Sequence, residues 1–128
     1  MSVLSKRILV VDDSATMRRI LCNVLAQIGF TSVTSATGGG QAIALLNSEE
    51  YGLVISDWKM EPITGLDLVR AIRGTEKIAS MPVLMVSAES EKNRIITAIA
   101  CGISDYIVKP FTRRVLEQKL ENIFGPLS

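Results

Sequence analysis

Three aspartates and one lysine stand at places in this sequence where their side chains could act together. Asp12 and Asp13 follow a short apolar run rich in β-branched residues, Asp57 follows a second such run, and Lys109 follows a third. If these runs are parallel strands, their carboxyl ends meet at one edge of a sheet and bring the four side chains close together. Adjacent carboxylates repel each other unless a cation neutralises them. The pattern therefore predicts a Mg²⁺ site, which in turn attracts a phosphate oxygen.

The third aspartate suggests a covalent step. Asp57 ends the run Leu53–Ser56, and a carboxylate in that position is a candidate nucleophile that would form an aspartyl phosphate. Phosphoryl transfer depends mainly on positioning and charge neutralisation, which Mg²⁺ on one side and Lys109 on the other would supply. Ser87 ends another apolar run and could donate its hydroxyl to a phosphoryl oxygen.

Each of these residues, taken alone, has a simpler explanation. The pair Asp12-Asp13 could be an acidic helix N-terminus, Ser87 an ordinary turn residue, and Lys109-Pro110 a turn that ends a strand. The combination of all of them at equivalent strand ends favours one shared site.

Five short apolar runs must position these residues. The expected strands are Ile8–Val11, Ser32–Ala36, Leu53–Ser56, Val83–Ser87 and Tyr106–Val108. Three of them are continuously apolar, which is typical of a parallel sheet covered on both faces. Between the runs, apolar residues recur at helical spacing, most clearly from Met17 to Ile28, with Ser14 as the expected N-cap and Gly29 as the expected end.

The fivefold alternation of strand and helix predicts an α/β fold with a doubly wound, five-stranded parallel sheet. Ligands in such sheets bind at the carboxyl ends of the strands, where the strand order reverses. We expect residues 1–128 to form a single domain, because the length suits one domain and neither a linker nor a low-complexity segment interrupts the pattern.

Composition argues against several other classes. Lys and Arg number 14 against 13 Asp and Glu, so the net charge of +1 offers no electrostatic footprint for nucleic acid. No apolar run approaches the ~20 residues that a membrane helix needs. The chain has two cysteines far apart and no histidine, so we expect no zinc site and reduced thiols in the cytoplasm.

Four stretches carry a resemblance to a known family. They are Ile8–Ser14, Ser56–Met60, Pro82–Glu89 and Tyr106–Phe111, which read ILVVDDS, SDWKM, PVLMVSAE and YIVKPF. Over essentially the whole chain the sequence resembles the receiver domains of two-component signalling, and specifically the stand-alone response regulators of chemotaxis. The resemblance implies a flavodoxin-like (βα)5 fold with strand order 2-1-3-4-5. It also implies a phosphorylation-activated switch whose only chemistry is Mg²⁺-dependent self-phosphorylation and autodephosphorylation, rather than an enzyme.

The resemblance also implies a role for each matched residue. Asp57 is the phosphoacceptor, and a sensor histidine kinase is its phosphodonor. Ser87 and Lys109 contact the phosphoryl group. Tyr106 is the switch residue, which turns inward when Ser87 is drawn to the phosphate. The implied Mg²⁺ ligands are Asp12, Asp13, Asp57 and the backbone carbonyl of Lys59.

Three positions depart from the pattern of the family. Ser87 stands where threonine is commoner, which keeps the hydroxyl and loses a methyl group. Glu61 precedes a proline that usually follows the methionine directly. Lys59 places a long cation two residues after Asp57, at a position that resembles the family's control of phosphoryl lifetime.

Isoleucines spaced four residues apart suggest a partner surface near the last strand. Core packing would account for them equally well, whereas the resemblance favours docking of a flagellar motor switch protein or a phosphatase. The expected surface comprises Ile95, Ile99, Ile103, Tyr106, Val108 and Lys119.

Three alternatives stay open at this point. An aspartate-nucleophile phosphatase on the same scaffold would typically carry a second acid two residues after the nucleophile, where this chain has Lys59. A flavin carrier would need a hydroxyl- and glycine-rich phosphate loop, and Asp12-Asp13 would repel the phosphate of FMN. The chain could also be an excised receiver domain of a larger response regulator. As a stand-alone protein it is expected to be a monomer.

Overall fold

The computed structural model describes residues 2–127, and its strands form one parallel sheet. The strands are β1 (Ile8–Val11), β2 (Val33–Ala36), β3 (Leu53–Ser56), β4 (Val83–Ser87) and β5 (Asp105–Val108). They pair in the order β2-β1-β3-β4-β5, and every pairing is parallel. The expected fold class and the strand order implied by the resemblance are confirmed. Two strands begin one residue away from the sequence-based boundary, at Val33 and Asp105.

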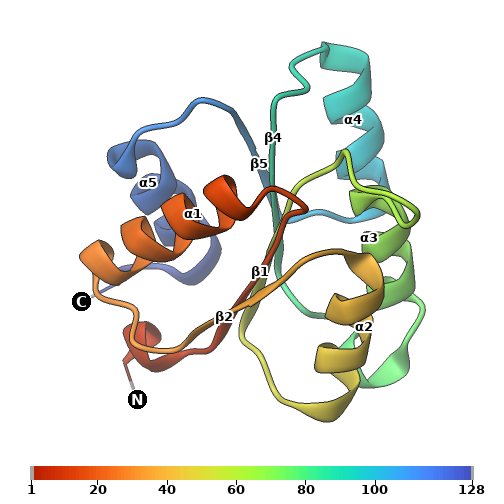
Figure 1. The fold of residues 1–128 in the computed structure, drawn as a ribbon. Coiled ribbons are helices and arrows are strands. Elements are labelled where there is room, and N and C mark those ends of the chain that lie inside the picture. Colours follow the sequence, from red (N-terminus) through yellow and green to blue (C-terminus); the bar gives the residue numbers. More distant parts are fainter. Residues whose placement is uncertain (1, 128) are drawn as a thin grey trace.

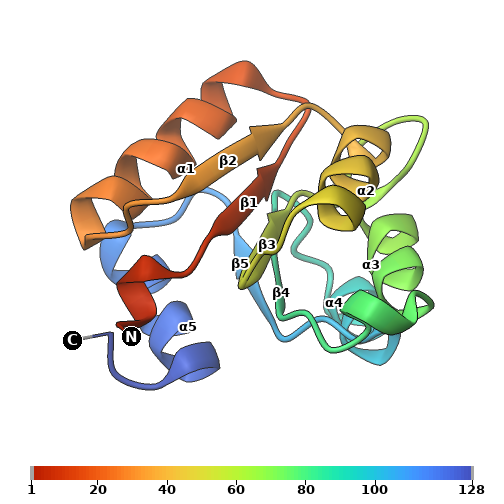
Figure 2. The same ribbon diagram turned by 90° about the horizontal axis from the view of Figure 1, so that it is seen from below.

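Within residues 2–127, five α-helices and two short 3-10 helices accompany the strands. They are η1 (Val3–Ser5), α1 (Ala15–Ile28), α2 (Gly39–Ser48), α3 (Gly65–Arg73), η2 (Glu76–Ile78), α4 (Lys92–Cys101) and α5 (Arg113–Phe124). Helices α1 and α5 cover one face of the sheet, and α2, α3 and α4 cover the other (Figure 1). Figure 2 shows the same two helical layers from below, with the sheet between them. Within residues 2–127, no helix is both long and apolar enough to cross a membrane.

The central strands alternate between two apolar cores, which explains their continuous apolar sequences. In β1, Ile8 and Val10 pack with α1 and α5, while Leu9 and Val11 pack with the helices of the other face. All four side chains are fully buried. Burial of one such side chain contributes about 1.5–3 kcal/mol, so β1 anchors both layers and fixes the position of the residues that follow it.

Local sequence signals set the helix boundaries. The Ser14 hydroxyl accepts a hydrogen bond from the backbone N–H of Met17 (3.2 Å), as expected of an N-cap. Gly29 ends α1 with φ 125°, a backbone conformation that favours glycine. Both boundaries predicted for this helix are confirmed.

Arg73 ties together the segments at the amino edge of the sheet. Its guanidinium donates hydrogen bonds to the carbonyl oxygens of Ala79 (2.9 Å), Met81 (2.6 Å) and Gly102 (2.7 and 3.0 Å). Burial lowers the pKa of the Arg73 guanidinium from its usual value, and the carbonyl oxygens compensate for the lost water. Because Gly102 caps α4, Arg73 fixes the C-terminal end of that helix to α3.

Candidate functional site

The sheet ladder continues one residue beyond three strands and fixes the backbone of the candidate residues. The N–H of Asp12 donates to the last carbonyl of β2 (3.2 Å), and the N–H of Asp57 donates to the last carbonyl of β1 (3.0 Å). The N–H of Lys109 donates to the last carbonyl of β4 (2.8 Å). Asp12, Asp57 and Lys109 therefore leave the sheet at one edge, as the sequence pattern predicted.

Three carboxylates gather at this edge. Asp12, Asp13 and Asp57 each place one carboxylate oxygen within 4.8 Å of the other two. Asp12 is buried, Asp13 is exposed and Asp57 is intermediate. Carboxylate oxygens that leave one side open to water are the donors that Mg²⁺ prefers, so this set fits the ion.

Lys109 neutralises part of this negative charge. Its ammonium lies 3.1 Å from Oδ2 of Asp12 and 3.5 Å from Oδ2 of Asp57. Burial raises the pKa of the Asp12 carboxyl, and the opposing effects of the Ser14 N–H and the Lys109 ammonium do not cancel it. An ionised Asp12 therefore opposes folding in part, and a divalent cation would relieve that cost.

Asp57 has one oxygen held and one directed at a cation. The backbone N–H of Trp58 donates to Oδ1 of Asp57 (2.7 Å), while Oδ2 faces the Lys109 ammonium. The Asp57 side chain is 11% exposed, which keeps it reachable from outside. This arrangement presents a single, oriented carboxylate oxygen to an incoming electrophile.

Ser87 and Tyr106 both form hydrogen bonds with the backbone of Glu89. The buried Ser87 hydroxyl accepts a hydrogen bond from the Glu89 N–H (3.3 Å). The Tyr106 hydroxyl donates to the Glu89 carbonyl (2.7 Å), and the residue is 8% exposed. Burial raises the pKa of the Tyr106 phenol. Tyr106 thus lies inward, in the orientation that the resemblance assigns to the switched form.

Lys59 and Glu61 line a hollow beside the carboxylates. The hollow has a volume of about 430 Å³ and is also lined by Asp13 and Trp58. The Lys59 ammonium lies 3.9 Å from a carboxylate oxygen of Glu89. The peptide bonds Glu61–Pro62 and Lys109–Pro110 are cis.

Gly65 belongs to the site, although sequence reasoning did not single it out. A Cβ at Gly65 would overlap the carbonyl oxygen of Asp57 and lie 2.8 Å from the Cα of Trp58. The Gly65 N–H also donates to the Trp58 carbonyl (2.8 Å). The start of α3 therefore packs directly against the backbone that carries Asp57. The available signal was the pair Thr64-Gly65, a polar cap followed by glycine at a helix start.

The residues expected to form a partner surface line one groove. The groove has a volume of about 320 Å³, and its lining includes Ile95, Ile99, Ile103, Tyr106, Val108 and Lys119. The Lys119 ammonium pairs with Asp105 at its rim (2.9 Å).

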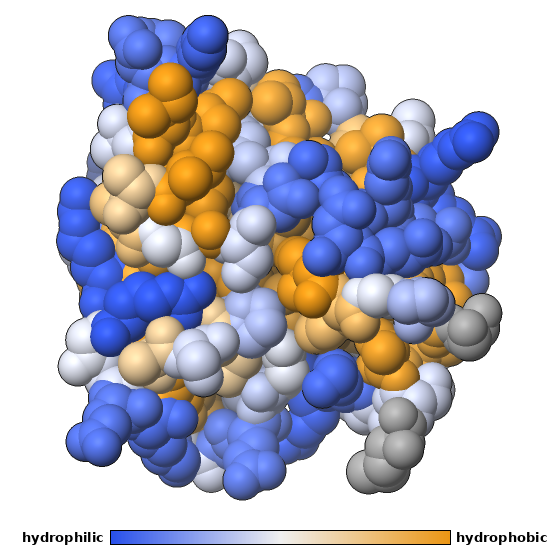
Figure 3. Space-filling view, turned by 180° about the vertical axis from the view of Figure 1, so that it is seen from behind, coloured by the Kyte–Doolittle hydropathy of each residue, from blue (hydrophilic) through white to orange (hydrophobic). Residues whose placement is uncertain are grey.

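Exposure within this groove is uneven. Ile99 is 57% exposed, whereas Ile103, which directly follows the α4 cap residue Gly102, is 8% exposed. Ile96 was not among the expected residues, yet it is 52% exposed on the same helix. The exposed apolar surface of α4 therefore includes Ile96, which was not predicted, and little of Ile103, which was. Figure 3, which views the molecule from behind, shows an elongated hydrophobic patch.

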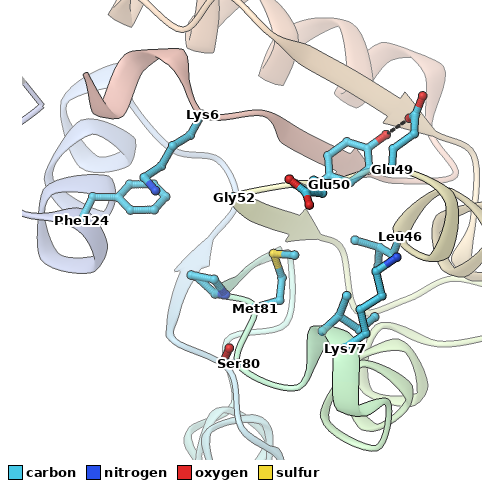
Figure 4. Close-up of a pocket in the computed structure, with 12 residues that line it drawn as sticks. Lys6, Leu46, Glu49, Glu50, Gly52, Lys77, Ser80, Met81 and Phe124 are labelled. Atoms are coloured by element: carbon cyan, nitrogen blue, oxygen red, sulfur yellow. Dashed lines mark hydrogen bonds between the residues drawn. The ribbon is translucent and has the colours of Figure 1, made fainter. Parts of the chain in front are cut away.

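A larger hollow of about 500 Å³ lies at the opposite, amino edge of the sheet (Figure 4). Two of its charged groups already have partners within the chain: Lys6 lies over the Phe124 ring (5.7 Å to the centroid), and Glu49 accepts a hydrogen bond from the Tyr51 hydroxyl (2.7 Å). The hollow lacks the converging, oriented groups that distinguish the carboxylate edge, which remains the candidate site.

The match with a family model defines the class of protein. The response regulator receiver domain model matches residues 8–121, so the chain belongs to this family of phosphorylation-dependent signalling domains. Members of the family are signalling switches rather than conventional enzymes. They generally bind Mg²⁺ at an acidic cluster and receive phosphate from histidine kinases.

Within this family, the chain is similar to chemotaxis proteins. It is 46% identical to the chemotaxis protein CheY of Pseudomonas aeruginosa over 118 residues, which cover 92% of this chain and 95% of the relative. It is 45% identical to a CheY homolog of Campylobacter jejuni over 120 residues, covering 93% and 92%.

Solved structures agree with the fold. The structure of CheY4 from Vibrio cholerae superposes with a TM-score of 0.87 at 28% identity, covering 94% of this chain and 99% of the other. The receiver domain of sensor histidine kinase PA1611 from P. aeruginosa, solved with a magnesium ion coordinated in its active site cleft, shares the fold at 24% identity, with a TM-score of 0.85 and coverage of 95% and 99%.

Proposed function

We propose that this chain is a chemotaxis response regulator that is activated by phosphorylation of Asp57. The observation that carries the proposal is the oriented Asp57 carboxylate, with Oδ1 held by the Trp58 N–H and Oδ2 3.5 Å from the Lys109 ammonium. Two further carboxylates of the Mg²⁺-binding type lie beside it. The similarity to chemotaxis proteins named CheY supports the biological setting.

The residues of the site divide the chemistry between them. Mg²⁺ would be held by Asp12, Asp13, Asp57 and the Lys59 carbonyl, and when bound it supplies positive charge opposite the phosphoryl oxygens. Oδ2 of Asp57 attacks the phosphorus of a phosphohistidine or an acyl phosphate in line, and the bond from phosphorus to the donor breaks as the aspartyl phosphate forms. Lys109 and the Ser87 hydroxyl take up contacts with the transferred oxygens.

Regulation follows from contacts that differ between the two forms. A phosphoryl group on Asp57 draws the Ser87 hydroxyl toward it and away from the Glu89 N–H, which shifts the loop after β4. The position of that loop determines whether Tyr106 is held inward, because the Tyr106 hydroxyl bonds to the Glu89 carbonyl. The surface of α4, β5 and α5 then changes its affinity for a partner such as the flagellar motor switch or a phosphatase.

Residues 1–128 act as one receiver domain, in monomeric form and in the cytoplasm, where the free thiols of Cys22 and Cys101 stay reduced. A sensor histidine kinase is the phosphodonor, and small phosphodonors such as acetyl phosphate can substitute for it. The aspartyl phosphate is lost again by autodephosphorylation.

Intact-mass spectrometry tests the phosphoacceptor directly. Wild-type protein incubated with acetyl phosphate and Mg²⁺ should gain the mass of one phosphoryl group, whereas Asp57→Asn should gain none. Wild-type protein with EDTA in place of Mg²⁺ serves as the second arm and should also gain none. Equal phosphoryl incorporation by Asp57→Asn and wild type would overturn the assignment.

A further inference from the structure

An ion pair joins the loop after β3 to the loop after β4. The Lys59 ammonium lies 3.9 Å from Oε2 of Glu89. The Glu89 side chain is 15% exposed and that of Lys59 is 69% exposed, so the ammonium reaches the carboxylate from the solvent side. This pair takes no part in the proposed phosphoryl transfer.

Glu89 connects that ion pair to the candidate switch residue. Its Oε1 accepts a hydrogen bond from the Glu91 N–H (3.0 Å), which fixes the side chain against its own loop. Its N–H donates to the Ser87 hydroxyl (3.3 Å), and its carbonyl accepts from the Tyr106 hydroxyl (2.7 Å). Glu89 therefore contacts Lys59 through its side chain and Tyr106 through its backbone carbonyl.

We propose that Lys59 is a positioning residue of the switch: its ammonium holds Glu89 where the Glu89 carbonyl receives the Tyr106 hydroxyl, and so favours the inward position of Tyr106. This inference rests on the proposed function, in which Tyr106 is the switch residue. Ion pairs with one exposed partner shift an equilibrium by at most about fivefold and are weakened by salt. Lys59 thus biases the inward position without locking it, and ionic strength modulates the bias.

The two tyrosines of the chain make the position of Tyr106 measurable. Tyr51 and Tyr106 are 9% and 8% exposed, and the chain contains no other tyrosine. With ring-labelled tyrosine and a soluble gadolinium chelate, the two NMR ring signals should relax about equally in the wild type. Tyr106→Phe assigns the signals, and Tyr51 is the internal reference.

We expect Lys59→Met to increase the paramagnetic relaxation of Tyr106 and leave that of Tyr51 unchanged. Glu89→Gln should do the same, since glutamine keeps an oxygen for the Glu91 N–H and removes only the charge. Lys59→Arg should behave like wild type. Combining Lys59→Met with Glu89→Gln should add nothing to either change alone, because both remove the same interaction. Salt at 1 M should reproduce the effect in wild type but not in Lys59→Met.

Lys77→Met provides the matched control, because Lys77 is an exposed lysine at the opposite edge of the sheet (Figure 4). It should leave both signals unchanged. An unchanged Tyr106 signal in Lys59→Met, or equal changes in Lys59→Met and Lys77→Met, would overturn the inference. The measurement needs no phosphorylation, so a negative result here leaves the Asp57 assignment intact. Likewise, the position of Tyr106 can still be measured if Asp57 is not phosphorylated.

Discussion

The Lys109 ammonium contacts two carboxylates at once, so the shape of this cation matters as much as its charge. It lies 3.1 Å from Asp12 and 3.5 Å from Asp57, in a site that leaves the side chain 15% exposed. A lysine ammonium is a compact point charge, whereas an arginine guanidinium is a planar fork of donors. The compact ammonium contacts both carboxylates from one point, which a planar guanidinium does not reproduce.

Lys109→Arg should therefore accept phosphate on Asp57 but fail to transmit the signal. The charge that assists transfer is retained, while the guanidinium displaces the groups around the phosphoryl oxygens. Intact-mass analysis should show phosphoryl incorporation. Phosphorylation should raise partner affinity at least about tenfold less than it does in wild type, because the variant no longer shifts between the two states. A full wild-type gain in affinity would remove Lys109 from the switch.

Burial of Asp12 makes the stability of the folded protein depend on pH. The folded-state pKa of Asp12 is raised above its ordinary value of 3.8, so the stabilising contribution of this group is complete below pH 3.8 and is lost as the pH rises through the folded-state pKa. In EDTA at neutral pH, Asp12→Asn should exceed wild type in unfolding free energy by on the order of 1 kcal/mol, and should therefore unfold at a higher temperature.

Thermal unfolding followed by circular dichroism between neutral pH and pH 4 checks this expectation. The advantage of Asp12→Asn should shrink as the pH falls, because Asp12 in the wild type becomes protonated. Mg²⁺ should stabilise wild type more than the variant. A variant that is less stable than wild type in EDTA at neutral pH would contradict the argument.

At the scale of elements, the sequence was most informative where a local rule sets the structure. The boundaries of α1 follow from Ser14 and Gly29, and β1 follows from its unbroken apolar run, because capping and two-sided burial are properties of a few adjacent residues. The carboxylate cluster could also be predicted, since all parallel strands deliver their carboxyl ends to one edge.

Other features depend on contacts between distant segments, which no local pattern reports. The exposure of α4 is an example: periodicity identified its isoleucines, but the outward position of Ile96 and the burial of Ile103 depend on how Arg73 and Gly102 seat the helix. The close approach of Gly65 to the backbone of Asp57 likewise depends on how the start of α3 packs against the loop after β3.

Gly65→Ala should disturb the site through the backbone. The added Cβ would overlap the Asp57 carbonyl oxygen, so the start of α3 must move away from the loop that carries Asp57 and Lys59. We expect a loss of about 1–3 kcal/mol in unfolding free energy, together with weaker Mg²⁺ binding. Urea unfolding and a Mg²⁺ titration of Trp58 fluorescence measure the two effects.

Gly40→Ala is the matched control for this change. Gly40 lies in α2 with nothing within 4 Å of the position of a Cβ, so alanine there should stabilise the protein by about 0.5–1 kcal/mol and leave Mg²⁺ binding unchanged. Equal effects of the two substitutions would show that the close approach at Gly65 is unimportant.

At the scale of the whole molecule, β5 belongs to both the site and the proposed partner surface. It carries Tyr106, and Lys109 follows it directly, while the exposed isoleucines of α4 lie alongside. Phosphate recognition and partner recognition therefore share β5, whereas the exposed isoleucines of α4 belong to the partner surface alone.

Ile99→Asp should separate the two functions. Ile99 is 57% exposed, so the substitution should change stability by no more than about 0.5 kcal/mol and leave phosphorylation of Asp57 unchanged. Loss of an apolar anchor should weaken binding of a flagellar motor switch peptide about tenfold. Ile20→Asp, at a 42% exposed isoleucine on α1, is the control and should bind normally. Normal binding by Ile99→Asp would remove α4 from the partner surface.

The Arg73 contacts make α4 a lever with one fixed end. Two guanidinium hydrogen bonds hold the Gly102 carbonyl at the C-terminal end of the helix, whereas the N-terminal end at Lys92 continues from the loop that carries Glu89. A helix of 10 residues is about 15 Å long, so a shift of that loop becomes a rotation about Gly102. The amplitude grows with distance from the pivot, and Ile96 therefore travels farther than Ile99 when the loop moves.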